Sequence, residues 1–348
     1  MYFSEPENGI NSDTGILLFI AGFGGSSNSN IYKKMREKIA DEYNFVTVQC
    51  NYFGWEFMQK SQMIKNPNLD YKELKQIFTE EELLRIYNNG NLDFNKFLNI
   101  GSKYNIKLSV NEDLSGENYN NFNDMSLIQA IDNIGAVLRV MNIIYDNNYE
   151  FNASKVFIYG HSQGAYLAYL CNAFAPKLFS LIIDNSAWLF PIYLNSNRAI
   201  QYKIGDLSLI VEFDYLAKKI DYDRELIYLP KLYSKFINNC NIISYHGTTD
   251  SLITNIDKRK FCLSIEKCLY NEISNDKVDG VIFKSTNHGL DADFLELFKY
   301  TINNLEKFNI EIGKSNCFKL DDYVKIKTQK QEYLIDYTNV LPQLKTLF

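Results

Sequence analysis

Short apolar runs alternate with longer amphipathic stretches along most of this chain. Six of the runs are rich in β-branched and aromatic residues and have the length of buried strands, and most gaps between them have helical composition. This alternation predicts an α/β fold, in which a mostly parallel sheet is flanked by helices. The expected strands cover 16–20, 45–51, 155–159, 181–184, 241–245 and 281–284, and the expected helices cover 31–43, 126–147, 165–174, 257–270 and 292–308.

Two polar, aromatic insertions, 54–123 and 188–239, interrupt this alternation. Both leave the expected sheet at the carboxyl ends of strands, where open α/β sheets bind ligands, so we expect them to form a cap. Tyrosine rings in a cap would suit sugars, although the 25 tyrosines of the chain fit a compositional bias equally well. The aromatic residues noted in the second insertion are Phe190, Tyr193, Tyr202, Phe213, Tyr215, Tyr222, Tyr228 and Tyr233.

The C-terminal extension carries two runs in which apolar and polar residues alternate, 323–327 and 332–337. They predict a β-hairpin. If residue 16 begins the equivalent of the third strand of such a fold, the usual first two strands are missing, and we expect the hairpin to cover the sheet edge that they would protect. The expected domains are a core made of 1–53, 124–187 and 240–310, a first insertion at 54–123, a cap insertion at 188–239 and a hairpin extension at 311–348.

The third expected strand leads directly into Gly160-His161-Ser162-Gln163-Gly164, and a helix follows. A serine between two glycines at a strand-to-helix turn is typical of a nucleophile elbow. The glycines are needed because residues two before and two after the serine approach each other closely. Ser162 is therefore a candidate nucleophile, and a glycine-serine turn without catalytic function is the alternative.

A serine nucleophile requires a histidine base and an acid that orients it, and the chain has only three histidines. His161 lies inside the elbow and points away from Ser162, so we expect it to be a packing residue. His246 ends a strand and is followed four residues later by Asp250. His288 lies in a loop after the last expected strand, which favours it as the base.

The order Ser162, Asp250, His288 is the order of nucleophile, acid and base in this kind of fold. Asp250 alternatively serves only as an N-cap of the following helix. Asp184, at the end of the fourth expected strand, is then the alternative acid, since a neighbouring strand end could reach the same histidine.

An oxyanion hole requires backbone amides that meet near the serine. The first expected strand leads into a loop at 21–27 that contains three glycines. We expect the Phe23 amide to pair with the Gln163 amide there. A phosphate-binding loop is disfavoured because the glycines have neither the GxGxxG spacing nor a following GK[ST].

These motifs resemble the α/β-hydrolase superfamily, over about 16–305. The segments 181–188 and 278–289 are also similar to a bacterial hydrolase-like family of unassigned function that is associated with surface-glycan and flagellin-modification loci. The first resemblance implies a Ser-His-Asp triad and an acyl-enzyme intermediate. The second implies a glycan precursor as the substrate neighbourhood.

Composition narrows the possible partners, the location and the role of the cysteines. The net charge of −6, without a basic stripe, makes nucleic acid an unexpected partner. No run approaches the ~18 apolar residues of a membrane span, and no signal peptide opens the chain, so a cytoplasmic location is expected. The cysteines lack metal-binding spacing, which predicts free thiols; they are Cys50, Cys171, Cys240, Cys262, Cys268 and Cys317.

The sequence therefore predicts a serine esterase or deacylase that acts on a small acylated molecule or glycan precursor, without a metal or cofactor. An acyltransferase with the same triad would hand the acyl group to a sugar hydroxyl instead of water. A hydrolase-fold binding protein with an idle triad is the alternative from another class. The sequence leaves the oligomeric state open.

Overall fold

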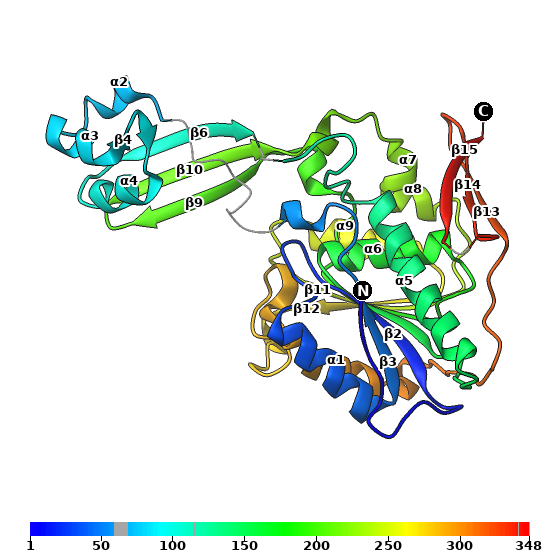
Figure 1. The fold of residues 1–348 in the computed structure, drawn as a ribbon. Helices are drawn as coiled ribbons and strands as arrows, with labels where there is room; N and C mark the ends of the chain where they lie inside the picture. The colour runs from blue at the N-terminus through cyan, green and yellow to red at the C-terminus, as the bar shows by residue number, and fades with distance from the viewer. Residues whose placement is uncertain (59–68, 114–115, 340, 348) are drawn as a thin grey trace. The chain divides into compact units, whose positions relative to one another are not determined.

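The computed structural model describes residues 1–58, 69–113, 116–339 and 341–347. It divides the chain into two compact units, each assembled from separate segments (Figure 1). Unit 1 comprises Met1–Trp55, Asp124–Pro191 and Tyr222–Phe348, and unit 2 comprises Glu56–Asn123 and Ile192–Asp221.

Unit 1 is built on a seven-stranded sheet with the order β1-β3-β2-β7-β8-β11-β12. All neighbouring strands are parallel except the first pair, β1 and β3. This is the mostly parallel sheet that the sequence predicts. The strands are β1 (Tyr2–Ser4), β2 (Gly15–Ile20), β3 (Phe45–Gln49), β7 (Val156–His161), β8 (Leu181–Asn185), β11 (Asn241–Gly247) and β12 (Cys268–Ile273).

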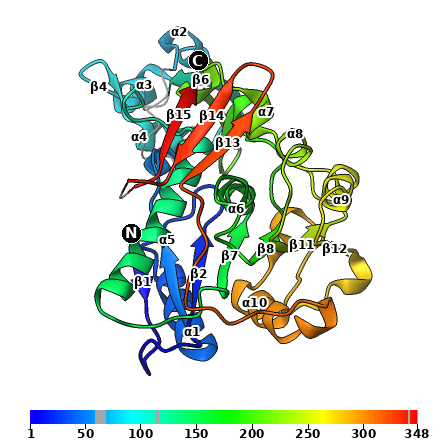
Figure 2. The same ribbon diagram turned by 90° about the vertical axis from the view of Figure 1, so that its right-hand side faces the viewer.

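Helices cover both faces of this sheet, because its central strands are buried on both sides (Figure 2). Helices α1 and α10 pack on one face, where Leu17, Ile183 and Leu297 share one apolar cluster. Helices α5, α6 and α9 cover the other face. The helices are α1 (Asn30–Tyr43), α5 (Leu127–Asp146), α6 (Gln163–Phe174), α9 (Asn255–Leu263) and α10 (Phe294–Asn303).

The last strand of the sheet differs from the sequence prediction. The segment 281–284 is not a strand, because Oδ1 of Asp279 accepts the backbone N–H groups of Val281, Ile282 and Phe283 and folds them into a turn. The helix predicted over 257–270 ends at Leu263, and its last residues belong to β12 instead.

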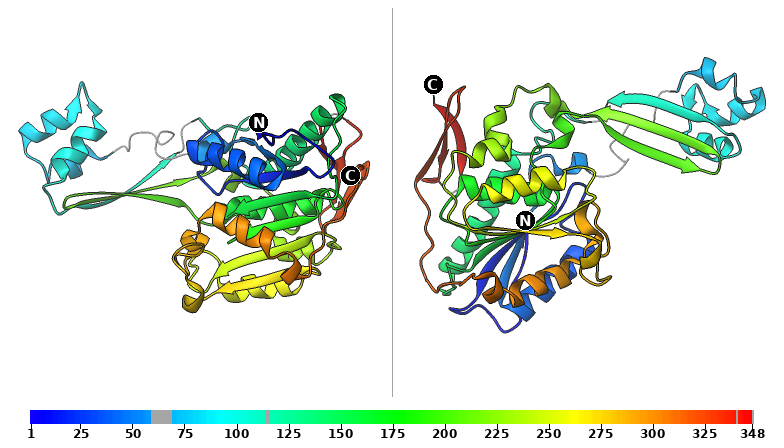
Figure 3. Two further views of the ribbon diagram at one scale, coloured as in Figure 1. Left: turned by 90° about the horizontal axis from the view of Figure 1, so that it is seen from below. Right: turned by 180° about the vertical axis from the view of Figure 1, so that it is seen from behind.

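The predicted C-terminal hairpin is present, but it belongs to a separate three-stranded sheet (Figure 3). This sheet does not extend the main one: the edge beside β3 is paired by β1. It is fastened to the α6 side of unit 1, where the Tyr337 hydroxyl donates to the Phe174 carbonyl over 2.8 Å. The idea that the hairpin protects the edge of the main sheet is therefore wrong. Its strands are β13 (Tyr323–Lys327), β14 (Glu332–Asp336) and β15 (Gln343–Leu347).

Unit 2 combines residues from both predicted insertions. Strand β6 from the first insertion pairs in parallel with β10 from the second, and β9 pairs antiparallel on the other side of β10. The end of the second insertion, 222–239, instead belongs to unit 1 and forms α7 (Arg224–Ile227) and α8 (Leu229–Tyr233). The cap function stays a prediction, and part of the first insertion, 59–68 and 114–115, lies outside the described residues. The elements of unit 2 are α2 (Tyr71–Leu74), α3 (Glu80–Ile86), β4 (Tyr87–Asn88), β5 (Asn91–Leu92), α4 (Phe94–Gly101), β6 (Lys107–Asp113), β9 (Arg198–Ile204) and β10 (Leu207–Asp214).

Several aromatic residues of the second insertion are core residues. Phe213 and Tyr215 are buried within unit 2, and Tyr233 is buried in unit 1, where its hydroxyl donates to the Tyr169 carbonyl. These three rings stabilise the fold and present no face to a ligand.

Candidate active site

The elbow at Ser162 has the tight geometry that its glycines predict. Ser162 has φ 55° and ψ −118°, a strained backbone for a residue with a side chain, between the end of β7 and the start of α6. A Cβ atom on Gly160 would lie 2.5 Å from the backbone of Ala165, and one on Gly164 would collide with the carbonyl of Ile20. Both positions therefore require glycine.

The side chains of Ser162, His288 and Asp250 form one chain of hydrogen bonds. The distance from Ser162 Oγ to His288 Nε2 is 2.7 Å, and that from His288 Nδ1 to Asp250 Oδ2 is 2.8 Å. The carboxyl group of Asp250 is fully buried, whereas His288 keeps 17% of its side chain exposed. The histidine thus lies between a buried acid and a hydroxyl that it can deprotonate.

The environment of Asp250 keeps its carboxyl group ionised. Burial raises the pKa of Asp250, but the hydrogen bond and charge of His288, together with the backbone N–H groups of Ile253 and Leu252, outweigh this and lower the pKa overall. Oδ1 accepts those two N–H groups over 3.1 and 2.8 Å, which leaves Oδ2 for the histidine. Asp250 therefore caps the local turn and orients His288 at the same time.

His246 fixes the loop that carries this acid. Its Nε2 lies 2.9 Å from the carbonyl of Ile253, which accepts its proton, and 3.6 Å from Asp250 Oδ2. Burial and the charge of Lys258 lower the pKa of His246, so the ring is neutral at pH 7. His246 is thus a buried residue that stabilises the loop of Asp250, and His288 is the histidine that bonds to Ser162.

The loop of the acid and the loop of the base are also fastened to each other. The backbone N–H of Thr249 donates to the Thr286 carbonyl over 3.0 Å, and the two threonine hydroxyls are 2.7 Å apart. A Cβ atom on Gly247 would collide with the same Thr286 carbonyl, so the close approach of the loops depends on that glycine.

Comparison with known families places the chain in one of them. A family described as "Protein of unknown function (DUF2920)" matches residues 9–197, more than half of the chain. The chain belongs to this family. No curated protein matches the chain.

Solved structures that resemble this one include two esterases and a peptidase. Est1E from Butyrivibrio proteoclasticus, solved with ferulic acid bound, is 14% identical over 88% of this chain and 93% of its own, with a TM-score of 0.45. Est2 from Thermogutta terrifontis is 13% identical over 90% and 91%, with a TM-score of 0.40. The acylaminoacyl peptidase of Pyrococcus horikoshii is 12% identical over 92% of this chain but 40% of its own, with a TM-score of 0.45.

His161 lies between two loops of the site. The sequence predicts only that it is a packing residue. A Cβ atom on Gly22 would lie 2.7 Å from His161 Nδ1, and one on Gly289 would lie 2.6 Å from His161 Nε2. The imidazole is therefore wedged between the loop after β2 and the loop of the base. Desolvation, followed by the nearby charge of His288, lowers the pKa of His161 to about 4, so the wedge is neutral at pH 7.

This lowered pKa predicts a stability loss in mild acid. The unfolded chain protonates His161 near pH 6.5 and the folded chain near pH 4, so the stabilisation is complete above pH 6.5 and is lost as the pH falls towards 4. We expect the free energy of unfolding of the wild type to fall by about 2 kcal/mol more than that of His161→Gln between pH 7 and pH 4. Urea melts at both pH values measure this, and equal losses in the two proteins would contradict it.

The end of β8 joins Ser162 to the loop of His288, a role that could not be predicted from its polar residues alone. The Asn185 carbonyl accepts the Ser162 backbone N–H over 2.8 Å. The Ser186 hydroxyl accepts the Gly289 N–H over 3.1 Å, and the Asn185 carboxamide donates to the Gly289 carbonyl over 3.3 Å. Asn185 and Ser186 thus position the residue that follows His288.

Asp184, the alternative acid, belongs to a different network. Its Oδ2 lies 2.6 Å from Lys258 Nζ and accepts the Tyr169 hydroxyl over 2.8 Å, while Oδ1 accepts the Ala187 N–H over 2.8 Å. Both charged side chains are fully buried. Burial lowers the pKa of Lys258, but the charge and hydrogen bond of Asp184, together with Cys262 and Cys268, outweigh it and raise the pKa overall, so the lysine stays charged. Asp250, and not Asp184, is the acid that contacts His288.

The predicted oxyanion donors lie on the two elements that meet at the elbow. Gln163 is the first residue of α6, where backbone N–H groups have no acceptor within the helix, and its side chain donates to Gln129 over 2.9 Å. Phe23 lies in the turn closed by the Gly25 N–H and the Gly22 carbonyl, with its ring 5.8 Å from that of Trp188. Their role as oxyanion donors stays a prediction.

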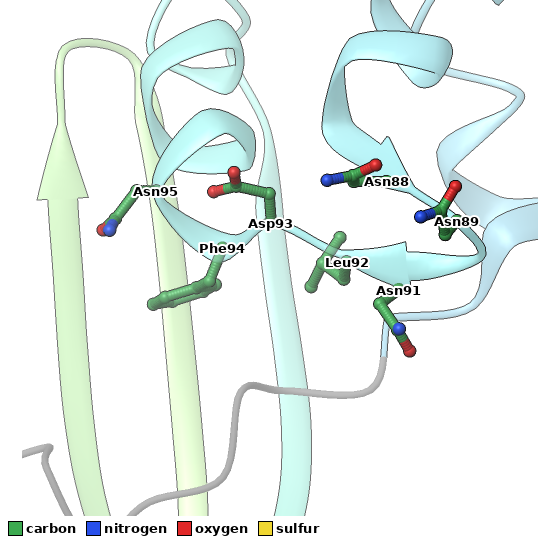
Figure 4. A pocket seen from close by; sticks show the side chains of 7 residues that line it. All are labelled: Asn88, Asn89, Asn91, Leu92, Asp93, Phe94 and Asn95. Carbon is green, nitrogen blue, oxygen red and sulfur yellow. The ribbon is translucent and has the colours of Figure 1, made fainter.

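Unit 2 carries a pocket of its own, of about 420 Å³, around the turn between β4 and β5 (Figure 4). Its walls offer carboxamides and one ring but neither a histidine nor a serine, so it has no nucleophile with a base. The lining residues are Asn88, Asn89, Asn91, Leu92, Asp93, Phe94 and Asn95.

Among the described residues, no group of three or more histidine, cysteine, aspartate or glutamate side chains could hold a metal ion. Within the same residues, α5 is long and apolar enough to cross a membrane, contrary to the sequence expectation, but 61% of its apolar window is buried inside the protein. That burial is typical of a core helix.

Proposed function

We propose that this chain is a serine-dependent esterase that forms an acyl-enzyme on Ser162. The observation that carries the proposal is the unbroken hydrogen-bond chain from Ser162 Oγ through the His288 ring to the buried carboxylate of Asp250. A serine with an oriented base and an ionised acid is the arrangement that activates a hydroxyl at neutral pH.

The proposed reaction has two stages. His288 Nε2 takes the proton of Ser162 as Oγ attacks the carbonyl carbon, and the amides of Gln163 and Phe23 stabilise the negative oxygen. His288 then protonates the leaving alcohol, and the carbonyl re-forms as the acyl-enzyme. In the second stage, His288 takes a proton from water, which attacks the acyl carbon, and Ser162 leaves with that proton.

A fluorophosphonate probe tests the nucleophile directly. We expect the folded wild-type chain to be labelled at Ser162, while Ser162→Ala and a heat-unfolded wild-type sample remain unlabelled. Mass spectrometry of the labelled peptide identifies the modified residue. Unlabelled, folded wild type would sink the catalytic assignment.

A panel of esters addresses the substrate. Acylated sugars are the class we propose, from the sequence resemblance to proteins of glycan-modification loci, and p-nitrophenyl esters of increasing acyl length serve as the reference. Release of free acid with water as acceptor supports a hydrolase. Transfer of the acyl group to an added sugar, in preference to water, would identify an acyltransferase.

A further inference from the structure

A groove of about 780 Å³ runs through unit 1, on a part of the fold that contains none of the triad residues. One wall is the continuous segment 324–329 at β13. The other wall comes from the end of α6 and from the chain that follows α8. Four of these residues, 324–327, are consecutive in the strand, and they can line one groove only if the edge of the strand faces it, since their side chains alternate between two faces.

Strand β13 is an edge strand of the C-terminal sheet, with β14 as its one neighbour in the described structure. Beyond the strand ends, the Thr328 N–H donates to the Gln331 carbonyl and the Tyr337 N–H donates to the Asp322 carbonyl. Even-numbered residues of β13 therefore bond to β14, because an antiparallel ladder pairs every second residue. The backbone N–H and C=O groups of the odd-numbered residues point away from β14, and two of these residues, Lys325 and Lys327, line the groove.

The opposite wall carries apolar side chains, some of them exposed, beside Lys177, Lys235 and Asn239. It contributes Leu232, Phe236 and Ile237, and 78% of the Ile237 side chain is accessible to solvent. Val324 and Ile326 add apolar surface from β13, where their exposure is intermediate. A strand placed beside β13 would bury apolar side chains of its own against this wall.

All charged residues that line the groove are lysines, in a chain whose net charge is −6. Lys177, Lys235 and Lys325 pair with Asp321, Glu225 and Glu332, which do not line the groove, whereas Lys327 has no ionic partner among the described residues. Lysines along an edge strand also oppose its pairing with an identical edge. The charge pattern therefore favours an acidic occupant and disfavours a second copy of this chain.

We propose that this groove is a docking site for an extended acidic segment of a partner protein, which adds to the free edge of β13 as a further strand. Alternation in that segment places apolar side chains beside Val324 and Ile326 and acidic side chains beside Lys325 and Lys327. Hydrogen bonds to the backbone groups of Lys325 and Lys327 supply the part of the recognition that does not depend on the partner's sequence. This site is independent of Ser162 and of the proposed esterase activity.

The test uses the full chain and a capped, fluorescent hexapeptide of alternating glutamate and valine, followed by fluorescence anisotropy. We expect binding that weakens at least about tenfold when lysines replace the glutamates, and similarly when N-methyl groups are placed on alternate amides in one of the two possible frames. Absence of binding, or equal binding of the peptides methylated in either frame, would overturn strand addition.

Variants of the protein distinguish binding to the strand edge from binding to positive charge alone. Lys325→Pro removes an N–H that faces the groove and leaves the bonds to β14 intact, so we expect a folded protein that binds the hexapeptide at least about tenfold more weakly. Lys327→Glu should weaken binding, and Lys33→Glu, on exposed α1, should not. Light scattering completes the test: a wild-type dimer that Lys325→Pro dissociates would identify a second copy as the occupant and overturn the proposal.

Discussion

Replacing Ser162 with alanine is expected to lower kcat for the best ester of the panel by about 10⁵- to 10⁶-fold, because the nucleophile of a triad is removed. His288→Ala should cost a similar amount, and the double variant little more, since the three residues act as one unit. Steady-state kinetics on the three variants measure this.

The control for this prediction is Ser234→Ala, which removes an exposed hydroxyl on the chain after α8. We expect it to keep wild-type turnover. Near-ultraviolet circular dichroism should show that each triad variant keeps its packing. A folded His288→Ala protein with wild-type turnover would contradict the assignment of the base.

Replacing Lys258 with methionine should lower the free energy of unfolding by about 3–5 kcal/mol, because it leaves the carboxylate of Asp184 buried without its counter-charge. Adding Asp184→Asn should recover part of this loss, since the carboxamide oxygen still accepts from Ala187 or Tyr169 and carries no charge. Urea melts of the wild type, both single variants and the double variant give the coupling.

Comparing Asp184→Asn with Asp250→Asn distinguishes the two candidate acids. Folded Asp184→Asn should keep kcat within about tenfold of the wild type, whereas Asp250→Asn should lose about 10⁴-fold because it favours the wrong tautomer of His288. If the free energy of unfolding of Lys258→Met lay within about 1 kcal/mol of the wild-type value, the buried pair would contribute little to stability. A larger loss of turnover in Asp184→Asn than in Asp250→Asn would reverse the roles of the acids.

Local patterns in the sequence account for much of the fold and of the candidate site. The elbow could be predicted because a strand, a serine between glycines and a helix follow one another within a few residues. The scarcity of histidine narrowed the base to His288, and chain order pointed to Asp250. All three side chains meet in the structure.

The errors arise where a distant or neighbouring group decides the local structure. The segment 281–284 has strand-like composition, but the carboxylate of Asp279 takes up its backbone N–H groups. The wedge role of His161 depends on Gly22 and Gly289, which approach it from distant parts of the chain. Likewise, the partner of Asp184 is a lysine whose burial only the packed fold reveals.

The parallel pairing of β6 with β10 joins two stretches that are separated by the loop 114–206, which includes α5, the elbow and β8. During synthesis, β6 therefore cannot pair until β10 has left the ribosome. Closing such a long loop also costs conformational entropy, which the pairing offsets only once it has formed. The first insertion cannot complete its sheet alone, so neither insertion can be transplanted without the other. Unit 2 would be gained or lost in evolution as two coordinated changes, on either side of the segment that carries Ser162.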